Sequence, residues 1–169
     1  MKRKLTLCII YKPFGADDAG FPQVLLGYKK RGFGAGRWNG FGGKVDEGET
    51  IEQAAHRELA EEAGIYALDL HQLGTIDFVF QEDERPVDTV KPVSNELEVH
   101  VFRATDISGV PAESDEMRPH WFYIDEIPFA EMWPDDRYWF PFFLRGTPFY
   151  GRFDFDGNDR LLKTHMAPL

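Results

Sequence analysis

The clearest hydrophobic pattern in the chain lies in residues 51–63, where apolar side chains recur at helical spacing. The recurring positions are Ile51, Ala54, Ala55 and Leu59. They fall on one stripe of a helix with about 3.6 residues per turn. Thr50 and Gln53 have the spacing of a capping box, and Gly64 readily adopts the left-handed conformation that follows a last helical turn. The sequence therefore predicts a helix over 51–63, with Ile65 folding back on its apolar stripe.

Shorter apolar and alternating runs predict the strands of a sheet. Such runs are rich in β-branched and aromatic residues and are bounded by turn residues. They occupy residues 5–11, 23–29, 72–80, 97–103 and 120–124. In 72–80 the side chains of Ile76, Phe78 and Phe80 share one face, and we expect this strand to form a hairpin with 97–103.

A second helix is predicted in the last third of the chain. It begins at Asp135 or Asp136, whose negative charge suits the N-terminus of a helix. It runs to about Arg145, and Gly146 ends it. Pro141 has no backbone N–H to donate, so it predicts either a kink or a later start of this helix.

Turn residues separate these elements. Two long segments, 14–22 and 81–96, contain turn residues and no apolar period. A long loop within a compact domain is either functional or mobile, and we expect 81–96 to be mobile. At the end of the chain, 149–155 and 160–164 predict a hairpin around Asp156-Gly157, a favoured turn pair.

Together these elements predict a single α/β domain over residues 1–169. The expected architecture is an α/β/α sandwich, with a mixed β-sheet between two main helices. A chain of 169 residues with 43% hydrophobic and 15% aromatic residues is large enough for a core and unlike a disordered protein. The net charge of −10 argues against binding to a nucleic acid polymer. It does not argue against a triphosphate, because metal ions can bridge an acidic site and an anion.

The N-terminal region decides what can be expected about localisation. A basic stretch at 2–4 followed by the apolar run 5–11 loosely imitates a signal peptide, but no small-residue cleavage site follows. A first strand is the better interpretation, and no run is long enough to span a membrane. Cys8 is the single cysteine, which excludes an internal disulfide and fits a reducing compartment. We expect a monomer in the cytoplasm, with a nuclear or mitochondrial fraction as an alternative.

The predicted helix over 51–63 carries acidic side chains on its apolar side. At roughly 100° per residue, Glu58 and Glu62 fall in the same sector as Ile51 and Ala55, with Glu61 beside them. Carboxylates four residues apart repel each other, more strongly when half-buried, and a divalent cation such as Mg²⁺ removes that conflict. The alternative is a solvated acidic face, which the register with the apolar stripe makes the poorer explanation.

The spacing of residues 43–65 resembles the signature of the Nudix hydrolases. The matching positions are Gly43, Glu49, Arg57, Glu58, Leu59, Glu61, Glu62, Gly64 and Ile65. Every fixed position of the signature is filled. The resemblance implies the Nudix fold and hydrolysis of nucleoside diphosphates linked to another group. It also implies a divalent metal, Mg²⁺ or alternatively Mn²⁺, held by the glutamates of the helix.

Residues 29–43 combine many glycines with the aromatic side chains of Phe33, Trp38 and Phe41. Glycine lets backbone N–H groups approach a ligand closely, whereas a flexible linker would lack the aromatic residues. We interpret this segment as a loop that lines the substrate site.

The resemblance extends to 29–43, 113–119 and 133–141, which look like a branch of the family that hydrolyses oxidised purine nucleoside triphosphates such as 8-oxo-dGTP and 2-hydroxy-dATP. The base pocket that it implies consists of Thr6, Phe33, Asn39, Phe78, Leu97, Trp133, Asp135, Asp136, Trp139 and Phe155. The metal ligands that it implies are Glu58 and Glu62, with Glu61, the backbone carbonyl of Gly42 and Glu116 as further candidates. Glu116 is alternatively the general base, and the spacing leaves open which glutamate has that role.

Four further residues have expected supporting roles. Arg57 should orient Glu61, which lies four residues on, and Glu49 should hold the loop that precedes the helix. Lys29 and Lys44 are candidates for phosphate contacts, although a solvated role fits them equally well.

The residue types of the implied base pocket suit a purine. Trp133 offers a flat face for base stacking, and Asn39 presents a donor beside an acceptor. The alternatives are core packing for the aromatic residues and helix capping for Asp135 and Asp136. Because close carboxylates can share a proton, we hypothesise that the aspartate pair lets the pocket accept bases with different hydrogen-bond patterns. Leu97 stands where related enzymes commonly carry Met, a more adaptable residue, which leaves the selectivity among modified bases open.

The expected reaction is hydrolysis between the α and β phosphates, which gives a nucleoside monophosphate and pyrophosphate. One alternative is a Nudix hydrolase for another nucleotide, such as O6-methyl-dGTP or another methylated purine nucleotide, ADP-ribose or a dinucleoside polyphosphate. A second alternative is a non-catalytic binding module with the Nudix fold, which is disfavoured because no signature glutamate is missing.

Overall fold

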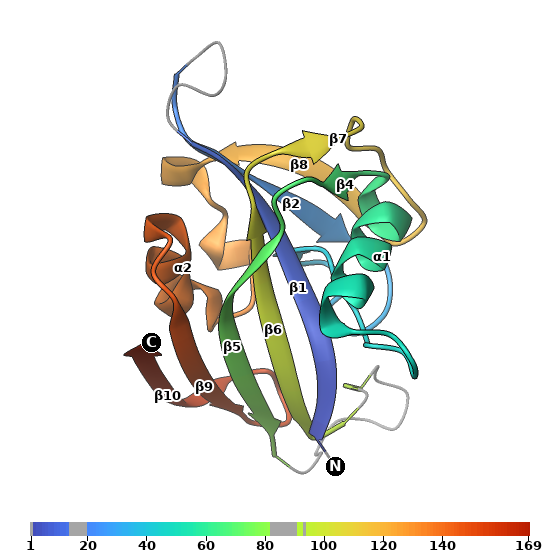
Figure 1. Ribbon diagram of the computed structural model, residues 1–169. Coiled ribbons are helices and arrows are strands. Elements are labelled where there is room, and N and C mark those ends of the chain that lie inside the picture. Colours follow the sequence, from blue (N-terminus) through green and yellow to red (C-terminus); the bar gives the residue numbers. More distant parts are fainter. Residues whose placement is uncertain (1, 14–19, 82–90, 93) are drawn as a thin grey trace.

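The computed structural model describes residues 2–13, 20–81, 91–92 and 94–169. The expected mobility of 81–96 concerns a segment that lies largely outside the described residues. In chain order the elements are β1 (Lys2–Lys12), β2 (Gln23–Lys29), β3 (Trp38–Asn39), α1 (Ile51–Ala63), β4 (Tyr66–Ala67), β5 (His71–Phe80), β6 (Glu96–Ala104), β7 (Ile107–Ser108), β8 (Met117–Tyr123), the 3-10 helices η1 (Ile124–Glu126) and η2 (Phe129–Glu131), α2 (Asp136–Arg145), β9 (Phe149–Phe155) and β10 (Leu161–Pro168) (Figure 1).

The central layer of the described residues is one mixed sheet of eight strands. Its order is β10-β9-β5-β6-β1-β2-β3, and β8 pairs with β2. β1 runs parallel to β6 and β5 runs parallel to β9, whereas the other neighbours are antiparallel. The antiparallel pairing of β5 with β6 confirms the hairpin predicted from 72–80 and 97–103. The short strands β4 and β7, which were not predicted, form a separate two-stranded sheet.

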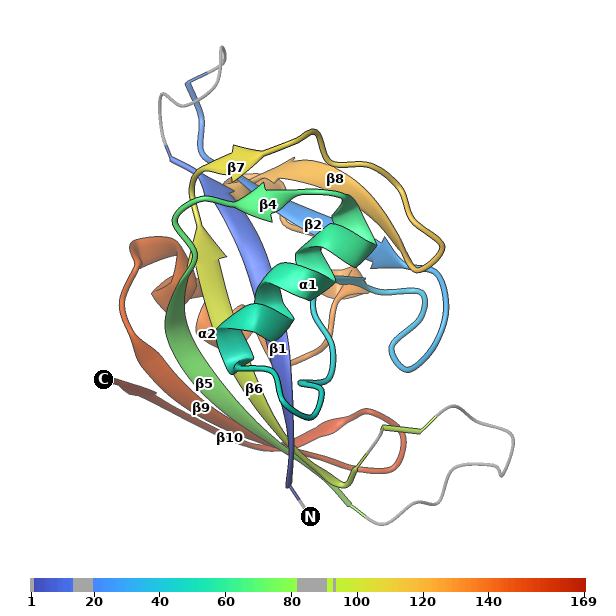
Figure 2. The same ribbon diagram turned by 45° about the vertical axis from the view of Figure 1, so that its right-hand side comes forward.

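The helices α1 and α2 cover opposite faces of the large sheet, as expected for an α/β/α sandwich (Figures 1 and 2). Alternation along β1 separates two cores: Ile9 packs on the α2 side, whereas Cys8 and Ile10 pack on the α1 side. Aromatic rings such as Phe143 fill the α2 side, and smaller residues with Leu59 fill the α1 side. The α2 side therefore holds the larger aromatic volume.

The ends of α1 are those that the sequence predicts. The N–H of Gln53 donates to Oγ1 of Thr50 at 3.1 Å, and the N–H of Thr50 donates to Oε1 of Gln53 at 2.8 Å, which completes the capping box. Gly64 ends the helix in the left-handed conformation with a φ of 69°. Ile65 is buried in the same core as Leu59, so it folds back on the apolar stripe as expected.

The predicted limits of α2 are also confirmed, from Asp136 to Arg145, but two interpretations of this region are wrong. Pro141 lies inside the helix, so it causes no later start. The buried rings beside it offset the one backbone hydrogen bond that a proline cannot make. Asp135 occupies the N-cap position without a capping hydrogen bond, so the capping alternative for its side chain is also wrong.

Several strands extend beyond their predicted limits, because pairing continues past the apolar run. β1 begins at Lys2 rather than at residue 5, since its parallel pairing with β6 already starts at Lys2 and Glu96. β8 begins at Met117 rather than at residue 120, because Met117 pairs with Lys29 of β2. Charged side chains on exposed positions mask such extensions in the hydrophobic pattern.

The turn between β9 and β10 is wider than the predicted Asp156-Gly157 pair. The carboxylate of Asp156 accepts hydrogen bonds from the backbone N–H groups of Asn158 and Arg160, at 2.8 and 2.9 Å. The left-handed position falls on Asp159, with a φ of 60°, and not on Gly157. The side chain of Asp156 thus determines a five-residue turn where the dipeptide alone suggests a two-residue one.

None of the helices in the described parts of the chain has the length and apolar content needed to cross a membrane.

Candidate active site

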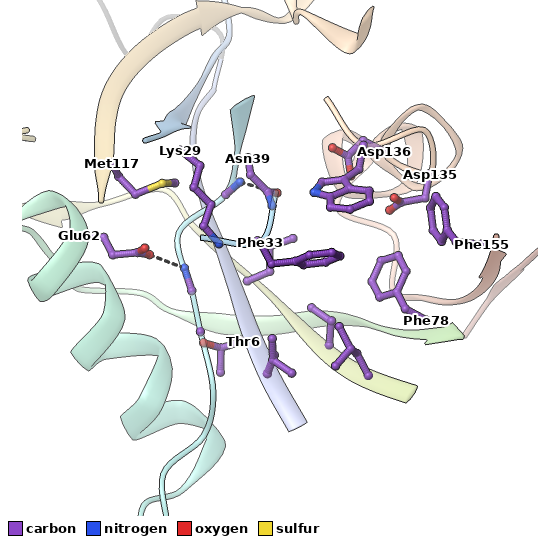
Figure 3. Close-up of a pocket in the computed structure, with 18 of the residues that line it drawn as sticks. Thr6, Lys29, Phe33, Asn39, Glu62, Phe78, Met117, Asp135, Asp136 and Phe155 are labelled. Atoms are coloured by element: carbon purple, nitrogen blue, oxygen red, sulfur yellow. Dashed lines mark hydrogen bonds between the residues drawn. The ribbon is translucent and has the colours of Figure 1, made fainter. Parts of the chain in front are cut away.

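A cavity of about 160 Å³ lies beside the glycine-rich loop and reaches from α1 toward the start of α2. Its lining comes mainly from β1, β5, β6 and the segment 29–43. The lining residues are Leu5, Thr6, Leu7, Lys29, Phe33, Asn39, Gly40, Gly42, Gly43, Glu62, Phe78, Phe80, Leu97, Val99, Met117, Trp133, Asp135, Asp136 and Phe155. Figure 3 shows Glu62 at one end and Asp135 with Asp136 at the other, with Lys29 and Phe33 between them.

Aromatic rings surround the end of the cavity near α2. We call this the aromatic end; its residues are Phe33, Phe78, Trp133, Asp135, Asp136 and Phe155. The ring centroids of Trp133 and Phe33 are 5.1 Å apart, and Phe155 meets Trp133 edge to face at 5.8 Å. Rings in tilted and edge contacts give this end of the cavity an apolar wall that suits a flat ligand.

The aspartate pair is the polar part of the aromatic end. Asp135 and Asp136 are only 1% and 3% exposed. The indole N–H of Trp139 donates to Oδ2 of Asp135 at 2.9 Å, whereas Oδ2 of Asp136 has no hydrogen-bond partner among the residues that the structure describes. A buried carboxylate oxygen without a partner costs free energy, so this atom is available to a hydrogen-bonding ligand.

Ionising both Asp135 and Asp136 would cost much free energy, because two adjacent buried charges would repel each other. Burial raises the pKa of Asp135 to about 6, although the hydrogen bond from Trp139 lowers it. Burial and the adjacent charge of Asp135 raise the pKa of Asp136 well above its ordinary value. Near neutral pH the arrangement therefore favours an ionised Asp135, which accepts from Trp139, beside a protonated Asp136.

Glu62 dominates the opposite end, which we call the acidic end and which consists of Glu58, Glu61, Glu62 and Glu116. Glu62 is 4% exposed, and its Oε1 accepts the backbone N–H of Gly42 at 2.7 Å. Only glycine fits at position 42, because a Cβ there would collide with the backbone carbonyl of Thr6. The loop therefore lies tight against β1 and presents its N–H group to the carboxylate.

The charges at the acidic end are poorly compensated. Burial raises the pKa of Glu62 to about 8, and the negative charges of Glu58 and Glu116 add to the rise. The hydrogen bond from the Gly42 N–H lowers this pKa but does not cancel the effect of burial. Burial also raises the pKa of Glu58, although Arg57 opposes it. Acidic side chains that raise one another's pKa lie within electrostatic range, and a cation would relieve their repulsion.

Arg57 links the glutamates of α1 to the loop before the helix. Its guanidinium donates to Glu49 at 2.7 and 3.1 Å, to Glu58 at 2.9 Å and to the backbone carbonyl of Lys44 at 3.0 Å. Its contacts with Glu61, at 3.3 and 3.4 Å, are longer. The hydrogen bonds from Arg57 lower the pKa of Glu49. Arg57 therefore contacts Glu61 as expected, but it is held most firmly by Glu49 and Glu58.

Glu61, Glu62 and Glu116 line a neighbouring recess together with Arg31, Ser114 and Asp115. Glu116 forms an ion pair with Arg31 at 3.3 Å. Among the described residues, no three His, Cys, Asp or Glu side chains lie close enough together to enclose a metal ion. The oxygen atoms at the acidic end nevertheless fit a hard divalent cation. They belong to carboxylates, of which Glu58 and Glu62 have a raised pKa that a cation would lower, and ligand oxygens can complete the coordination.

Two predicted residues do not reach the cavity. Trp139 is 1% exposed in the core behind Asp135, so it holds a carboxylate rather than lining the site. The backbone of Lys44 forms an isolated antiparallel β-bridge with Leu5 of β1, and Lys44 does not line the cavity. All other predicted substrate-binding residues line the cavity.

Sequence analysis missed several residues of the lining. Phe80 and Val99 follow Phe78 and Leu97 at a spacing of two residues, so strand alternation could have identified them. Met117 has no comparable signal, because its position depends on the pairing of β8 with β2.

The chain is similar to known proteins over most of its length. The profile of the NUDIX domain matches residues 3–143. An oxidized purine nucleoside triphosphate hydrolase of Mus musculus is 49% identical over 95% of this chain and 91% of its own length. A protein of the same name from Danio rerio is 51% identical over 94% and 90%. The crystal structure of a MutT protein from Bacillus halodurans superposes with a TM-score of 0.77 at 27% identity, covering 97% of both chains.

Proposed function

The chain belongs to the NUDIX domain family and is a hydrolase of the Nudix type, and from this premise we propose its substrates and products. It hydrolyses oxidised purine nucleoside triphosphates, 8-oxo-dGTP and 2-hydroxy-dATP among them, to the nucleoside monophosphate and pyrophosphate. The relatives from Mus musculus and Danio rerio are named oxidized purine nucleoside triphosphate hydrolases, and their similarity covers nearly the whole chain. The consequence of the reaction is the removal of oxidised precursors from the nucleotide pool.

One observation carries this proposal: a single cavity joins the aromatic end to the acidic end (Figure 3). The aromatic end suits a purine, because it offers ring faces for stacking and a buried carboxyl oxygen without a partner. Lys29 lies between the two ends, where its charge can contact phosphate. The order base, phosphate, glutamate matches a nucleotide laid along the cavity.

Nudix hydrolases generally use a divalent metal, and we propose Mg²⁺ for this chain. Glu58 and Glu62 would hold it, with Glu61, Glu116 and the carbonyl of Gly42 as further ligands. When bound, such an ion polarises phosphoryl oxygens and lowers the pKa of an attacking water. The protein's own contribution is orientation: the Gly42 N–H fixes the Glu62 carboxylate, and Arg57 fixes that of Glu58.

The aspartate pair supplies the hydrogen bonds that identify the base. A protonated Asp136 donates and an ionised Asp135 accepts, and moving the proton between them reverses these roles. The pair can therefore match both 8-oxo-guanine and 2-hydroxy-adenine, whose edges present different donors and acceptors. This supports the hypothesis drawn from the sequence that the pair broadens the range of bases.

Turnover of a nucleotide panel tests the proposal, with pyrophosphate detected for the triphosphates and the nucleotide products of every substrate separated by chromatography. The panel contains 8-oxo-dGTP, 2-hydroxy-dATP, dGTP, dATP, O6-methyl-dGTP, ADP-ribose and a dinucleoside polyphosphate, each with and without Mg²⁺. We expect kcat/KM for the two oxidised nucleotides to exceed that for dGTP and dATP at least about tenfold. A preference for the methylated nucleotide, ADP-ribose or the dinucleoside polyphosphate would assign a different substrate. Absence of hydrolysis of every nucleotide with Mg²⁺ would identify a binding module.

We also propose that the enzyme acts as a monomer in the cytoplasm, as expected from the sequence. Light scattering of the purified protein and fractionation of cells that express it test these two points.

A further inference from the structure

We propose that Arg37, held by Asp159, is a positioning residue that fixes the indole of Trp133 for base stacking and so contributes to substrate selectivity. This inference rests on the function proposed above. It concerns two residues that neither line the cavity nor belong to the acidic end.

The guanidinium of Arg37 lies on the indole of Trp133. Its Cζ atom is 4.2 Å from the ring centroid, a distance typical of a cation stacked on an aromatic face. Trp133 lines the cavity, whereas Arg37 does not. Trp133 thus lines the cavity although the cation covers one of its faces, so part of the indole remains accessible to a ligand.

The glycine-rich loop brings Arg37 to this position. The backbone carbonyl of Arg37 accepts the N–H of Lys29, the last residue of β2, at 3.0 Å. Gly34 of the same loop, with a φ of 87°, lies against the indole, where a Cβ would come within 3.1 Å of Nε1. The loop thus packs closely on Trp133 at two points, one apolar and one charged.

Asp159 contacts the same guanidinium group of Arg37 that lies on the indole. Its Oδ2 lies 3.5 Å from Nη2 of Arg37, across 122 residues of sequence. Asp159 is the one non-glycine residue with a positive φ among the described residues, and its N–H donates to the carbonyl of Asp156 at 3.3 Å. The turn between β9 and β10 therefore places the carboxylate of Asp159 beside the guanidinium of Arg37.

The physical consequence is a preorganised stacking surface. In the free protein an indole held by a cation and a close backbone has fewer rotamers to lose when a base binds, which favours affinity. A cation on one face also draws electron density from the ring. An oxidised purine carries an additional electron-rich oxygen, so a less electron-rich indole favours it over the unmodified base.

Three variants test the proposal. Arg37→Gln removes the cation, Arg37→Lys keeps the charge without the planar guanidinium, and Asp159→Asn removes the carboxylate while tolerating the left-handed conformation. We expect KM for 8-oxo-dGTP to rise about three- to tenfold in Arg37→Gln, with kcat within about twofold, because the lost interaction acts on binding. Arg37→Lys should be intermediate. Because Asp159 acts through Arg37, the double variant Arg37→Gln/Asp159→Asn should resemble Arg37→Gln alone.

A second readout needs no substrate. The indole N–H signal of Trp133 in a ¹⁵N spectrum, assigned with Trp133→Phe, should shift or broaden in Arg37→Gln and in Asp159→Asn. Lys12→Gln is the matched control, since Lys12 lies 4.1 Å from the ring centroid of Trp121 outside the cavity. It should move the Trp121 signal and leave KM unchanged.

The outcomes separate this inference from the proposed function. A KM within twofold of wild type in Arg37→Gln and Asp159→Asn overturns the inference, whatever the indole signal does. If wild type hydrolyses no oxidised nucleotide, the proposed function fails instead. In that case the variants are compared by calorimetric binding of 8-oxo-dGMP, and unchanged affinity overturns the inference.

Discussion

The two ends of the cavity each bury carboxylates, but they compensate the negative charge in different ways. At the aromatic end, Asp135 and Asp136 are adjacent at the start of α2, Trp139 donates to one of them, and their raised pKa values favour a shared proton. At the acidic end, Glu62 has one backbone hydrogen bond and feels the charges of Glu58 and Glu116. One end compensates the charge with a proton, and the other is suited to a metal ion.

This difference follows from the surroundings of each group. The aspartates are enclosed by aromatic rings, where a neutral carboxyl group is the favoured form and can donate a hydrogen bond. The glutamates border an open recess with Arg31, where phosphate, water and a cation can enter. The same residue chemistry therefore serves recognition at one end and catalysis at the other.

The largest effect is expected from Glu62→Gln, which removes the charge that suits a cation but keeps the shape of the side chain. We expect kcat to fall at least ~10²-fold, with binding of the product monophosphate retained because the aromatic end is untouched. Steady-state kinetics and calorimetry measure the two quantities. Glu52→Gln, on the exposed side of α1, is the control and should keep full activity. Near-normal turnover of Glu62→Gln would refute the assigned role.

The aspartate pair should respond differently, through base selectivity. Asp135→Asn and Asp136→Asn each fix one hydrogen-bond pattern, so we expect kcat/KM to fall about 10- to 100-fold for at least one of 8-oxo-dGTP and 2-hydroxy-dATP. The two variants should differ in which substrate they lose. Asp125→Asn, an exposed aspartate outside the cavity, is the control. Full activity of both pair variants on both nucleotides would remove the proposed proton sharing.

The pH dependence of stability gives a smaller effect that reports on the aromatic end without substrate. In the folded protein the pair keeps protons that the unfolded chain, with an aspartate pKa near 3.8, has already released. For Asp135 the stabilising contribution is therefore complete below about pH 4 and is lost as pH rises through about 6, whereas for Asp136, whose pKa is raised well above its ordinary value, the loss continues to higher pH. Urea unfolding of wild type and Asp136→Asn between pH 4 and 8 measures it, and we expect a flatter profile for the variant. Parallel profiles would show that the pair does not titrate as described.

The smallest effect is expected from Leu97→Met at the side of the cavity. The two side chains have similar volumes, so the free energy of unfolding should change by less than about 1.5 kcal/mol. The more adaptable Met should change the ratio of kcat/KM for the two oxidised nucleotides about two- to threefold. An unchanged ratio would show that the aspartates, rather than the adjacent apolar wall, determine selectivity.

Short spacings in the sequence predict most of the acidic end. The capping box at Thr50, the stop at Gly64 and the sector shared by Glu58 and Glu62 can all be derived from short spacings, because a helix converts spacing directly into direction. The aromatic end is less accessible to such reasoning. Its residues come from the loop after β2, from β5, from the start of α2 with the segment before it, and from β9, and only their resemblance to known sequences suggested that they meet.

The sequence by itself determined the two helices, most strands, the α/β architecture and the glutamates that suit a cation, since each depends on residues a few positions apart. Tertiary structure decided that Met117 reaches the cavity through β8 and that Asp159 meets Arg37. These contacts depend on the order and register of the strands. Many registers satisfy the same alternation of apolar and polar residues, and only the simultaneous packing of both helices on one sheet selects among them.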